Sequence, residues 1–180
     1  VNAVLAPGLL ERAVEAGLRS LFVGFESLTP ANLVEQRKYQ NLRRDYATAI
    51  RRLHDLGVMI NASFVFGMDA DDGAVFERTV TWAIEHGIET ATFHILTPYP
   101  GTALYRRLAD QGRITIHDWD QYDTRHTVFR PALMSPDELE HAVDEILHLQ
   151  ERQQLRLFLR HDHRARYVSA LVYLPRDRYT

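Results

Sequence analysis

Apolar runs of strand length alternate with helical stretches along the first half of the sequence. The apolar runs are residues 21–25, 58–66 and 90–96, and they lack the strict polar alternation of a half-exposed strand. Such runs are typical of strands that are buried on both faces. The helical stretches between them end at Gly57 and Gly87, where glycine suits the C-terminal cap. This order predicts right-handed βαβ units and a parallel sheet, either doubly wound or part of a barrel.

The sequence of 180 residues contains no cysteine. For this chain, that excludes disulfide bridges, zinc–thiolate sites, cysteine nucleophiles and iron–sulfur clusters held by its own thiolates. With 46% hydrophobic and 25% charged residues, the composition is that of a soluble globular protein. No apolar run approaches the roughly 20 residues of a membrane span, and no secretory signal is visible. We therefore expect a cytoplasmic protein without a membrane span.

Charge and short motifs exclude several further classes of function. The net charge is −3, and arginines near the C-terminus alternate with apolar residues like one face of a strand, so we expect no nucleic acid partner. No P-loop, GxSxG, HExxH or GxGxxG pattern supports a hydrolase, a nucleotide triphosphatase or a Rossmann domain. Asp69, Asp71 and Asp72 resemble the start of a calcium loop, but its glycine and final glutamate are missing. We expect these acids to cap the helix that follows.

Residues just after the apolar runs are candidates for a binding site, because parallel α/β folds bind ligands at the carboxyl ends of their strands. Glu26 and Ser27 follow the first run and offer a carboxylate and a hydroxyl, which suit an amine or a ribose diol. Capping of the next helix explains them equally well. Phe66 and Gly67 end the second run and offer an open backbone beside an aromatic ring, which suits adenine. A plain turn glycine is the simpler interpretation.

The third apolar run ends in the segment TPYPGT, residues 97–102. Two prolines, Pro98 and Pro100, and a glycine fix an unusual loop after this strand. Rigid loops at a strand end usually line a site, so Thr97, Pro98 and Pro100 join the candidates. A solvent-facing turn is the alternative.

The last part of the sequence has a different pattern and charge. A helix is predicted from Ser135, a favourable N-cap, to about Gln154. Residues 155–160 then alternate leucine with arginine or phenylalanine, and 167–174 form a second β-rich run, which predicts a hairpin. Residues 151–180 hold 7 of the 21 Lys and Arg residues but only 3 of the 24 Asp and Glu residues. Pattern and charge together indicate a boundary near residue 145.

Several segments resemble one known family in the same order: LFVGFES (21–27), RKYQN (37–41), FVFGMD (64–69) and ILTPYPGT (95–102). They are similar to the second half of the radical S-adenosylmethionine (SAM) barrel, in the subgroup whose full-length members carry an N-terminal cobalamin-binding domain. Two further segments continue the match: GRITIHDWDQYDTRHTVFRP (112–131) and MSPDEL (134–139). The resemblance covers about residues 1–143, and the combination of segments is specific although each alone is weak.

The resemblance implies a TIM-barrel-like α/β fold, a partial (β/α) barrel of parallel strands with flanking helices. In the family, a 4Fe–4S cluster reductively cleaves S-adenosylmethionine to a 5′-deoxyadenosyl radical, and a small-molecule substrate reacts, in some members by methyl transfer. No catalytic residue and no metal ligand carries over. The cofactor-binding positions that carry over are Glu26 and Ser27 for the ribose or methionine part, Phe66 and Gly67 for the adenine, and Thr97, Pro98 and Pro100 for the same pocket.

The sequence departs from the family because it has no counterpart of the CxxxCxxC segment that holds the cluster. The resemblance assigns that segment and the cobalamin domain to positions upstream of everything in this chain. Without three thiolates no electron reaches the sulfonium. We therefore expect a fragment that is inactive alone, with the ligands of the cluster and of cobalamin in the parent family only. Two alternatives are a non-catalytic module for an adenosyl ligand and a non-functional remnant whose exposed sheet edge favours self-association.

From residue 146 the sequence resembles another family. LRLF (155–158) and LVYLPRDRY (171–179) are similar to a regulatory-region segment of the large NAD-specific glutamate dehydrogenases, where they lie on paired strands. That segment is not catalytic, so no dehydrogenase activity is implied. The predicted domains are a partial radical SAM barrel at 1–145 and a helix end with a C-terminal β-hairpin tail at 146–180. A chimeric gene and a natural extension both remain open for the junction.

Overall fold

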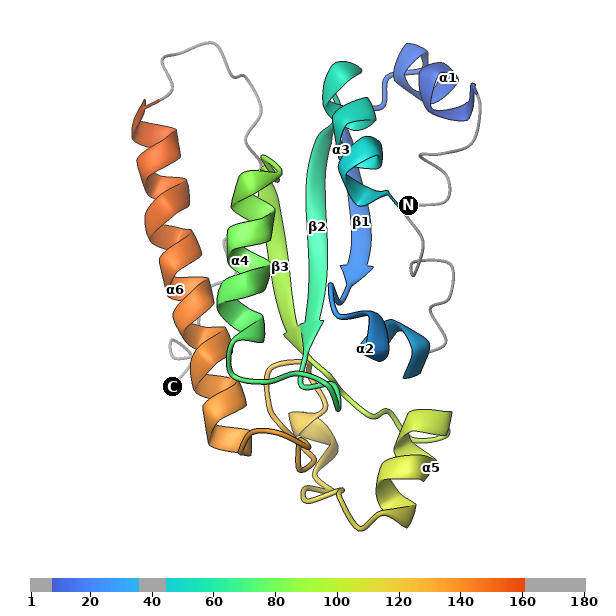
Figure 1. Cartoon of the computed structure of the whole chain (residues 1–180), viewed down its shortest axis with the longest axis vertical. Coiled ribbons are helices and arrows are strands. Elements are labelled where there is room, and N and C mark those ends of the chain that lie inside the picture. The colour runs from blue at the N-terminus through green and yellow to red at the C-terminus, as the bar shows by residue number, and fades with distance from the viewer. Residues whose placement is uncertain (1–7, 36–44, 161–180) are drawn as a thin grey trace. The chain divides into compact units, whose positions relative to one another are not determined.

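A computed structural model of the chain describes residues 8–35 and 45–160, with side chains as far as residue 148. The chain divides into two compact units, Val1–Leu147 and His148–Thr180. The sheet and the candidate site belong to the first unit. The elements in chain order (Figure 1), with η2 a 3₁₀ helix, are α1 (Leu9–Glu15), β1 (Ser20–Glu26), α2 (Pro30–Glu35), α3 (Tyr46–Asp55), β2 (Met59–Phe66), α4 (Val75–Glu85), β3 (Thr90–Ile95), α5 (Ala103–Asp110), η2 (Trp119–Gln121) and α6 (Pro136–Arg160).

The described strands form one parallel sheet in the order β1-β2-β3. Ser20 of β1 is in register with Met59 of β2, and Asn61 of β2 is in register with Thr90 of β3. The predicted α/β class and parallel sheet are confirmed. Closure into a partial barrel needs further strands and stays a prediction, as does self-association through a sheet edge.

Two glycines lead α3 and α4 directly into the next strand. Gly57 has a φ of 68°, and its amide donates to the His54 carbonyl at 2.9 Å. The amide of Val58 donates to the Leu53 carbonyl, also at 2.9 Å. Gly87 follows α4 with a φ of 66°. This is the Schellman pattern, whose left-handed residue favours glycine, so the predicted helix ends are confirmed.

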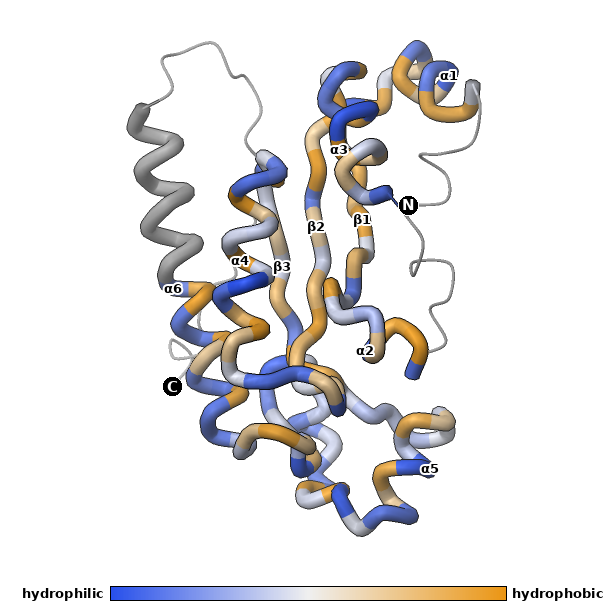
Figure 2. The backbone as a smooth tube through the Cα atoms, viewed as in Figure 1, coloured by the Kyte–Doolittle hydropathy of each residue, from blue (hydrophilic) through white to orange (hydrophobic). Residues whose placement is uncertain are grey.

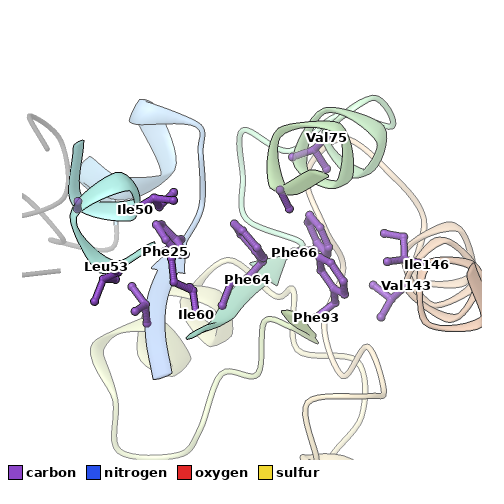
Figure 3. Close-up of a cluster of buried hydrophobic side chains, with 14 of the residues drawn as sticks. Phe25, Ile50, Leu53, Ile60, Phe64, Phe66, Val75, Phe93, Val143 and Ile146 are labelled. Carbon is purple, nitrogen blue, oxygen red and sulfur yellow. The ribbon is translucent and has the colours of Figure 1, made fainter. Parts of the chain in front are cut away.

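Stacked phenylalanine rings run across the sheet on the face that the helices cover (Figure 3). The ring centroids of Phe25 and Phe64 are 5.6 Å apart, those of Phe64 and Phe93 5.7 Å, and those of Phe93 and Phe66 5.9 Å. All four side chains are 5% exposed or less. Cross-strand aromatic pairs of this kind stabilise a sheet beyond the burial of their area. Helices α3, α4 and α6 add apolar side chains to this core: Ile50, Leu53, Val75, Val143 and Ile146.

The opposite face of the sheet, called the polar face below, carries Asn61, Ser63, Thr92 and His94 beside Phe22 and Val65 and is partly exposed. Asn61 and Thr92 lie on this face and are half-buried, and Phe22 of β1 is 62% exposed. The prediction that the strands are buried on both faces is therefore wrong for the described part of the chain. The reason is that α3, α4 and α6 pack their apolar residues against the other face. Figure 2 shows hydrophobic residues along most of β2, whereas α3 carries both hydrophilic and hydrophobic ones.

Helix α6 extends further than the sequence pattern indicates. A helix end near Gln154 and a strand after it are predicted, whereas α6 continues to Arg160. Leu155 and Leu159 satisfy both patterns, because they lie at the i, i+4 spacing of a helix as well as on one side of a strand. The rest of the predicted hairpin, residues 161–180, lies outside the described residues, and the hairpin stays a prediction. None of the described helices is long and apolar enough to cross a membrane.

We predict that Phe64→Ala lowers the free energy of unfolding by about 3–5 kcal/mol, because it removes the central ring of the stack and leaves a cavity. Phe64 is 0% exposed, and Phe22, 62% exposed, serves as the control. Phe22→Ala should change the free energy of unfolding by less than about 0.5 kcal/mol. Urea denaturation measures both, and equal effects of the two substitutions would contradict the one-sided core.

Candidate functional site

The carboxyl ends of the described strands lie at one edge of the sheet, because the strands are parallel neighbours. Glu26 ends β1, Phe66 ends β2 and Ile95 ends β3. The amide of Leu96 donates to the Phe66 carbonyl at 2.8 Å, which joins the ends of β2 and β3. The fold thus brings the candidate residues from the strand ends to a common edge.

Glu26 ends β1 in an unusual backbone conformation. Its φ is 66°, in the left-handed region that non-glycine residues rarely adopt, and the register with β2 shifts between Gly24 and Glu26. A Cβ at Gly24 would lie 3.0 Å from Oε1 of Glu26, so the carboxylate folds back over the glycine. Bulges of this kind re-aim a side chain and are common beside active sites. Such strain costs on the order of 1–3 kcal/mol, so it marks Glu26 as a functional candidate.

Two ionisable side chains experience the charge of the Glu26 carboxylate. Burial raises the pKa of Tyr46 to about 12, and the negative charge of Glu26 adds to the rise. Burial lowers the pKa of His94, Arg125 lowers it further, and Glu26 opposes both. The net shift favours a neutral imidazole close to the strand ends.

His94 is a candidate that sequence reasoning missed. It lies on β3 between Phe93 and Ile95, and its Nδ1 is 3.3 Å from Oγ1 of Thr124. The signal was available, because side chains alternate between the faces of a strand and both neighbours of His94 are apolar. Their burial assigns His94 to the polar face.

The end of β2 is closely packed against its neighbours. The Phe66 ring is 2% exposed and packs against the rings of Phe76 and Phe93, with centroids 4.8 and 5.9 Å away. Gly67 has a φ of 95°, and a Cβ there would come within 2.7 Å of Cδ2 of Leu139 in α6. Both the conformation and the packing require glycine at this position. Contact of Phe66 and Gly67 with an adenine stays a prediction.

The loop after β3 is held by its own hydrogen bonds. Thr97 is 9% exposed, and its hydroxyl donates to the Ile95 carbonyl at 3.1 Å. Pro98 is buried, whereas Pro100 is exposed. Thr102 caps α5 by accepting from the Tyr105 amide at 3.1 Å. This agrees with the predicted rigid loop, although the hydroxyl of Thr97 is already engaged with the backbone.

The loop after β2 uses Asp71 differently from the prediction. Ala74 occupies the N-cap of α4 without a side-chain cap hydrogen bond. Asp71 is 1% exposed and accepts from the amides of Gly67 and Met68 at 3.0 Å each. The prediction that Asp71 caps α4 is wrong, because the loop folds back and buries this carboxylate under the end of β2.

Charged side chains on the flank of this loop connect it to α2 and α5. Arg113 pairs with Asp69 at 2.7 Å, and Arg107 pairs with both Asp69 and Glu35. Burial acts to raise the pKa of Asp69, but the contacts with Arg113, Glu35 and Arg107 together outweigh it and lower that pKa. Asp69 is therefore a structural ion-pair partner in place of the predicted helix cap.

Curated relatives of this chain are methyltransferases and cyclases. It is 33% identical over 139 residues to the bacteriochlorophyllide d C-12(1)-methyltransferase of Chlorobaculum tepidum. This match covers 77% of this chain and 30% of that protein. It is 27% identical over 118 residues to the hopanoid C-2 methylase of Rhodopseudomonas palustris, covering 66% and 22%. It is 25% identical over 125 residues to the anaerobic magnesium-protoporphyrin IX monomethyl ester cyclase of Rubrivivax gelatinosus, covering 69% and 22%. This chain is a homologue of radical SAM enzymes. It spans less than a third of the length of these relatives.

The end of the chain is similar to a second family. Residues 156–180 match the family described as glutamate dehydrogenase, ACT2 domain. The resemblances of the barrel part and of the tail are thus both confirmed. The chain thus combines a part homologous to radical SAM enzymes with a C-terminal segment similar to a second family, and the nature of the junction stays a prediction.

The donor set of this chain does not fit the iron–sulfur cluster of the radical SAM enzymes. Their clusters are held by thiolates, and the sequence contains no cysteine. In the part of the chain that the structure describes, no group of three histidine or carboxylate side chains is arranged to hold a metal ion. The thiolates for such a cluster would have to come from outside this sequence.

We predict that His94 makes the protein less stable as the pH falls below about 6.5, because its folded pKa lies below that ordinary value. The unfolded chain then binds the proton that the folded chain resists, so the free energy of unfolding rises with pH in this range. In urea denaturation, the stability of wild type relative to His94→Gln should decrease as the pH is lowered through this window. His141→Gln removes an exposed histidine and is the control. A stability difference that is the same at every pH would refute the prediction.

Proposed function

We propose that this chain forms the part of a radical SAM barrel that binds the adenosyl end of SAM. The observation that carries the proposal is the left-handed conformation of Glu26 at the end of β1. The homology to radical SAM enzymes supports the same assignment. When bound, SAM supplies a sulfonium whose reductive cleavage gives a 5′-deoxyadenosyl radical.

The proposed roles follow from the groups at the sheet edge. The Glu26 carboxylate accepts hydrogen bonds from the ribose hydroxyls or from the methionine ammonium group. Hydrogen bonds to an ionised carboxylate are stronger than those to a neutral acceptor. The backbone of Phe66 and Gly67 contacts the adenine from the side away from α6, because Leu139 and Phe129 occupy the side toward which a Cβ at Gly67 would point. The loop of Thr97, Pro98 and Pro100 closes the same pocket from β3, since its prolines restrict its conformations. Ser27 supports this edge from a buried position.

Radical chemistry is not proposed for this chain alone. The sequence supplies no thiolate for a 4Fe–4S cluster, so the chain by itself is a non-catalytic module for an adenosyl ligand. In a protein that also holds the cluster and cobalamin, we infer methyl transfer to a small molecule. The relatives named for bacteriochlorophyllide d and for a hopanoid support a large, ring-containing substrate class.

Isothermal titration of the purified chain with SAM tests the proposal, with light scattering to establish that the sample is monodisperse. We predict saturable binding that Glu26→Gln weakens by on the order of tenfold, because a charged hydrogen-bond acceptor is lost. Adenosine should compete with SAM, since the proposed contacts are with the adenosyl group.

Glu85→Gln is the matched control, because Glu85 is an exposed carboxylate at the end of α4. It should leave the affinity unchanged. No heat of binding from a folded, monodisperse wild-type sample would overturn the proposed function, and equal affinities of wild type and Glu26→Gln would remove Glu26 from it.

A further inference from the structure

A buried amide–carboxylate pair connects two of the strand ends. Asn32 of α2 is 0% exposed and Asp71 of the loop after β2 is 1% exposed. Nδ2 of Asn32 donates to Oδ1 of Asp71 at 2.6 Å, across 39 positions of sequence. The pair therefore joins the segment that follows β1 to the segment that follows β2.

The remaining atoms of Asn32 are also engaged. Its Nδ2 donates to Oγ of Ser27, the residue directly after β1, at 3.2 Å. Its Oδ1 accepts from the amide of Ala70 at 3.0 Å. One side chain thus holds the end of β1 and the loop of β2 at a fixed spacing.

Asp71 holds the end of β2 with its other oxygen. Oδ2 accepts from the amides of Gly67 and Met68, both at 3.0 Å. Burial raises the pKa of Asp71, while the hydrogen bonds from Met68, Asn32 and Gly67 oppose that rise. A buried carboxylate is weak evidence for stability, because well-packed apolar residues in the same volume are often at least as stable. What the carboxylate provides is a defined position for several backbone groups.

We propose that Asn32 and Asp71 are positioning residues that set the spacing between the Glu26–Ser27 end of β1 and the Gly67 end of β2 for the adenosyl group. This inference rests on the proposed function. The inference adds two residues that act without touching the ligand. No sequence motif predicted this positioning role for them.

Exchange of the two side chains tests the inference. Asn32→Asp alone places two carboxylates against each other, where neither can donate a hydrogen bond. Asp71→Asn alone replaces the carboxylate that accepts from the Asn32 NH₂ group with a second side-chain amide. The double variant N32D/D71N restores the contact with reversed polarity, because the amide introduced at position 71 would donate to the carboxylate introduced at position 32. The carbonyl oxygen of the introduced amide still accepts from the amides of Gly67 and Met68. The introduced carboxylate still accepts from the Ala70 amide, and the Ser27 hydroxyl reverses to donate.

Each variant is titrated with SAM, and its folded fraction is determined by urea denaturation at the same temperature. We expect each single substitution to weaken SAM binding by on the order of tenfold in the folded protein. The double variant should return to within about threefold of wild type, since a cycle isolates the pairwise term. Asp72→Asn is the control, because Asp72 is an exposed neighbour whose partner is Arg78 on the surface; it should bind SAM like wild type.

Each outcome decides the inference. Wild-type affinity in folded single variants would overturn the positioning role and leave the proposed function intact. No binding by folded wild type would overturn both. If the single variants do not fold, the exchange still decides: a folded double variant with wild-type affinity supports the inference, and one that stays unfolded or binds weakly overturns it.

Discussion

The stack of Phe25, Phe64 and Phe93 connects the three described strands on one face, and the character of the other face follows from it. Side chains alternate along a strand, so each buried ring has neighbours that point the opposite way. Those neighbours include Ser63 beside Phe64 and His94 beside Phe93, both polar. Because the rings pack against the helices, the polar face and the strand ends are the part of the sheet where we propose that a ligand binds. The aromatic positions thereby set which side chains of the strands point away from the core.

The architecture could be predicted from local patterns, and the exceptions have physical causes. The apolar runs predicted the positions of the strands. Gly57 predicted a helix end, because glycine adopts the left-handed conformation there at little cost. One-sided burial could not be predicted, since it depends on which elements are present to cover the second face. The continuation of α6 beyond Gln154 could not be predicted either, because Leu155 and Leu159 fit both the spacing of a helix and that of a strand. Similarity to known families supplied the candidate residues that spacing alone left ambiguous.

The sequence predicted that the candidate residues lie at the strand ends, but it predicted neither their conformation nor His94 and Asn32; their contact with a ligand stays a prediction. That Glu26 lies at a strand end followed from its place after an apolar run, but its left-handed backbone depends on the register with β2. The sequence predicts Asp71 as a helix cap because it shows only that an acid precedes a helix. Its partners, Asn32 and the amides after β2, meet only in the folded chain. Both departures concentrate at the edge where the strands end, as expected where local rules yield to function.

Leu139 fills the volume that a side chain at Gly67 would occupy. The end of β2 and α6 are thus packed too closely at this point for any side chain to fit between them. A small outward movement of α6 would lose the dispersion contacts of Leu139 with this backbone, and an inward movement would bring Leu139 into collision with it. This side of the strand end is therefore filled, which leaves the polar side of the sheet as the approach for the proposed adenosyl ligand.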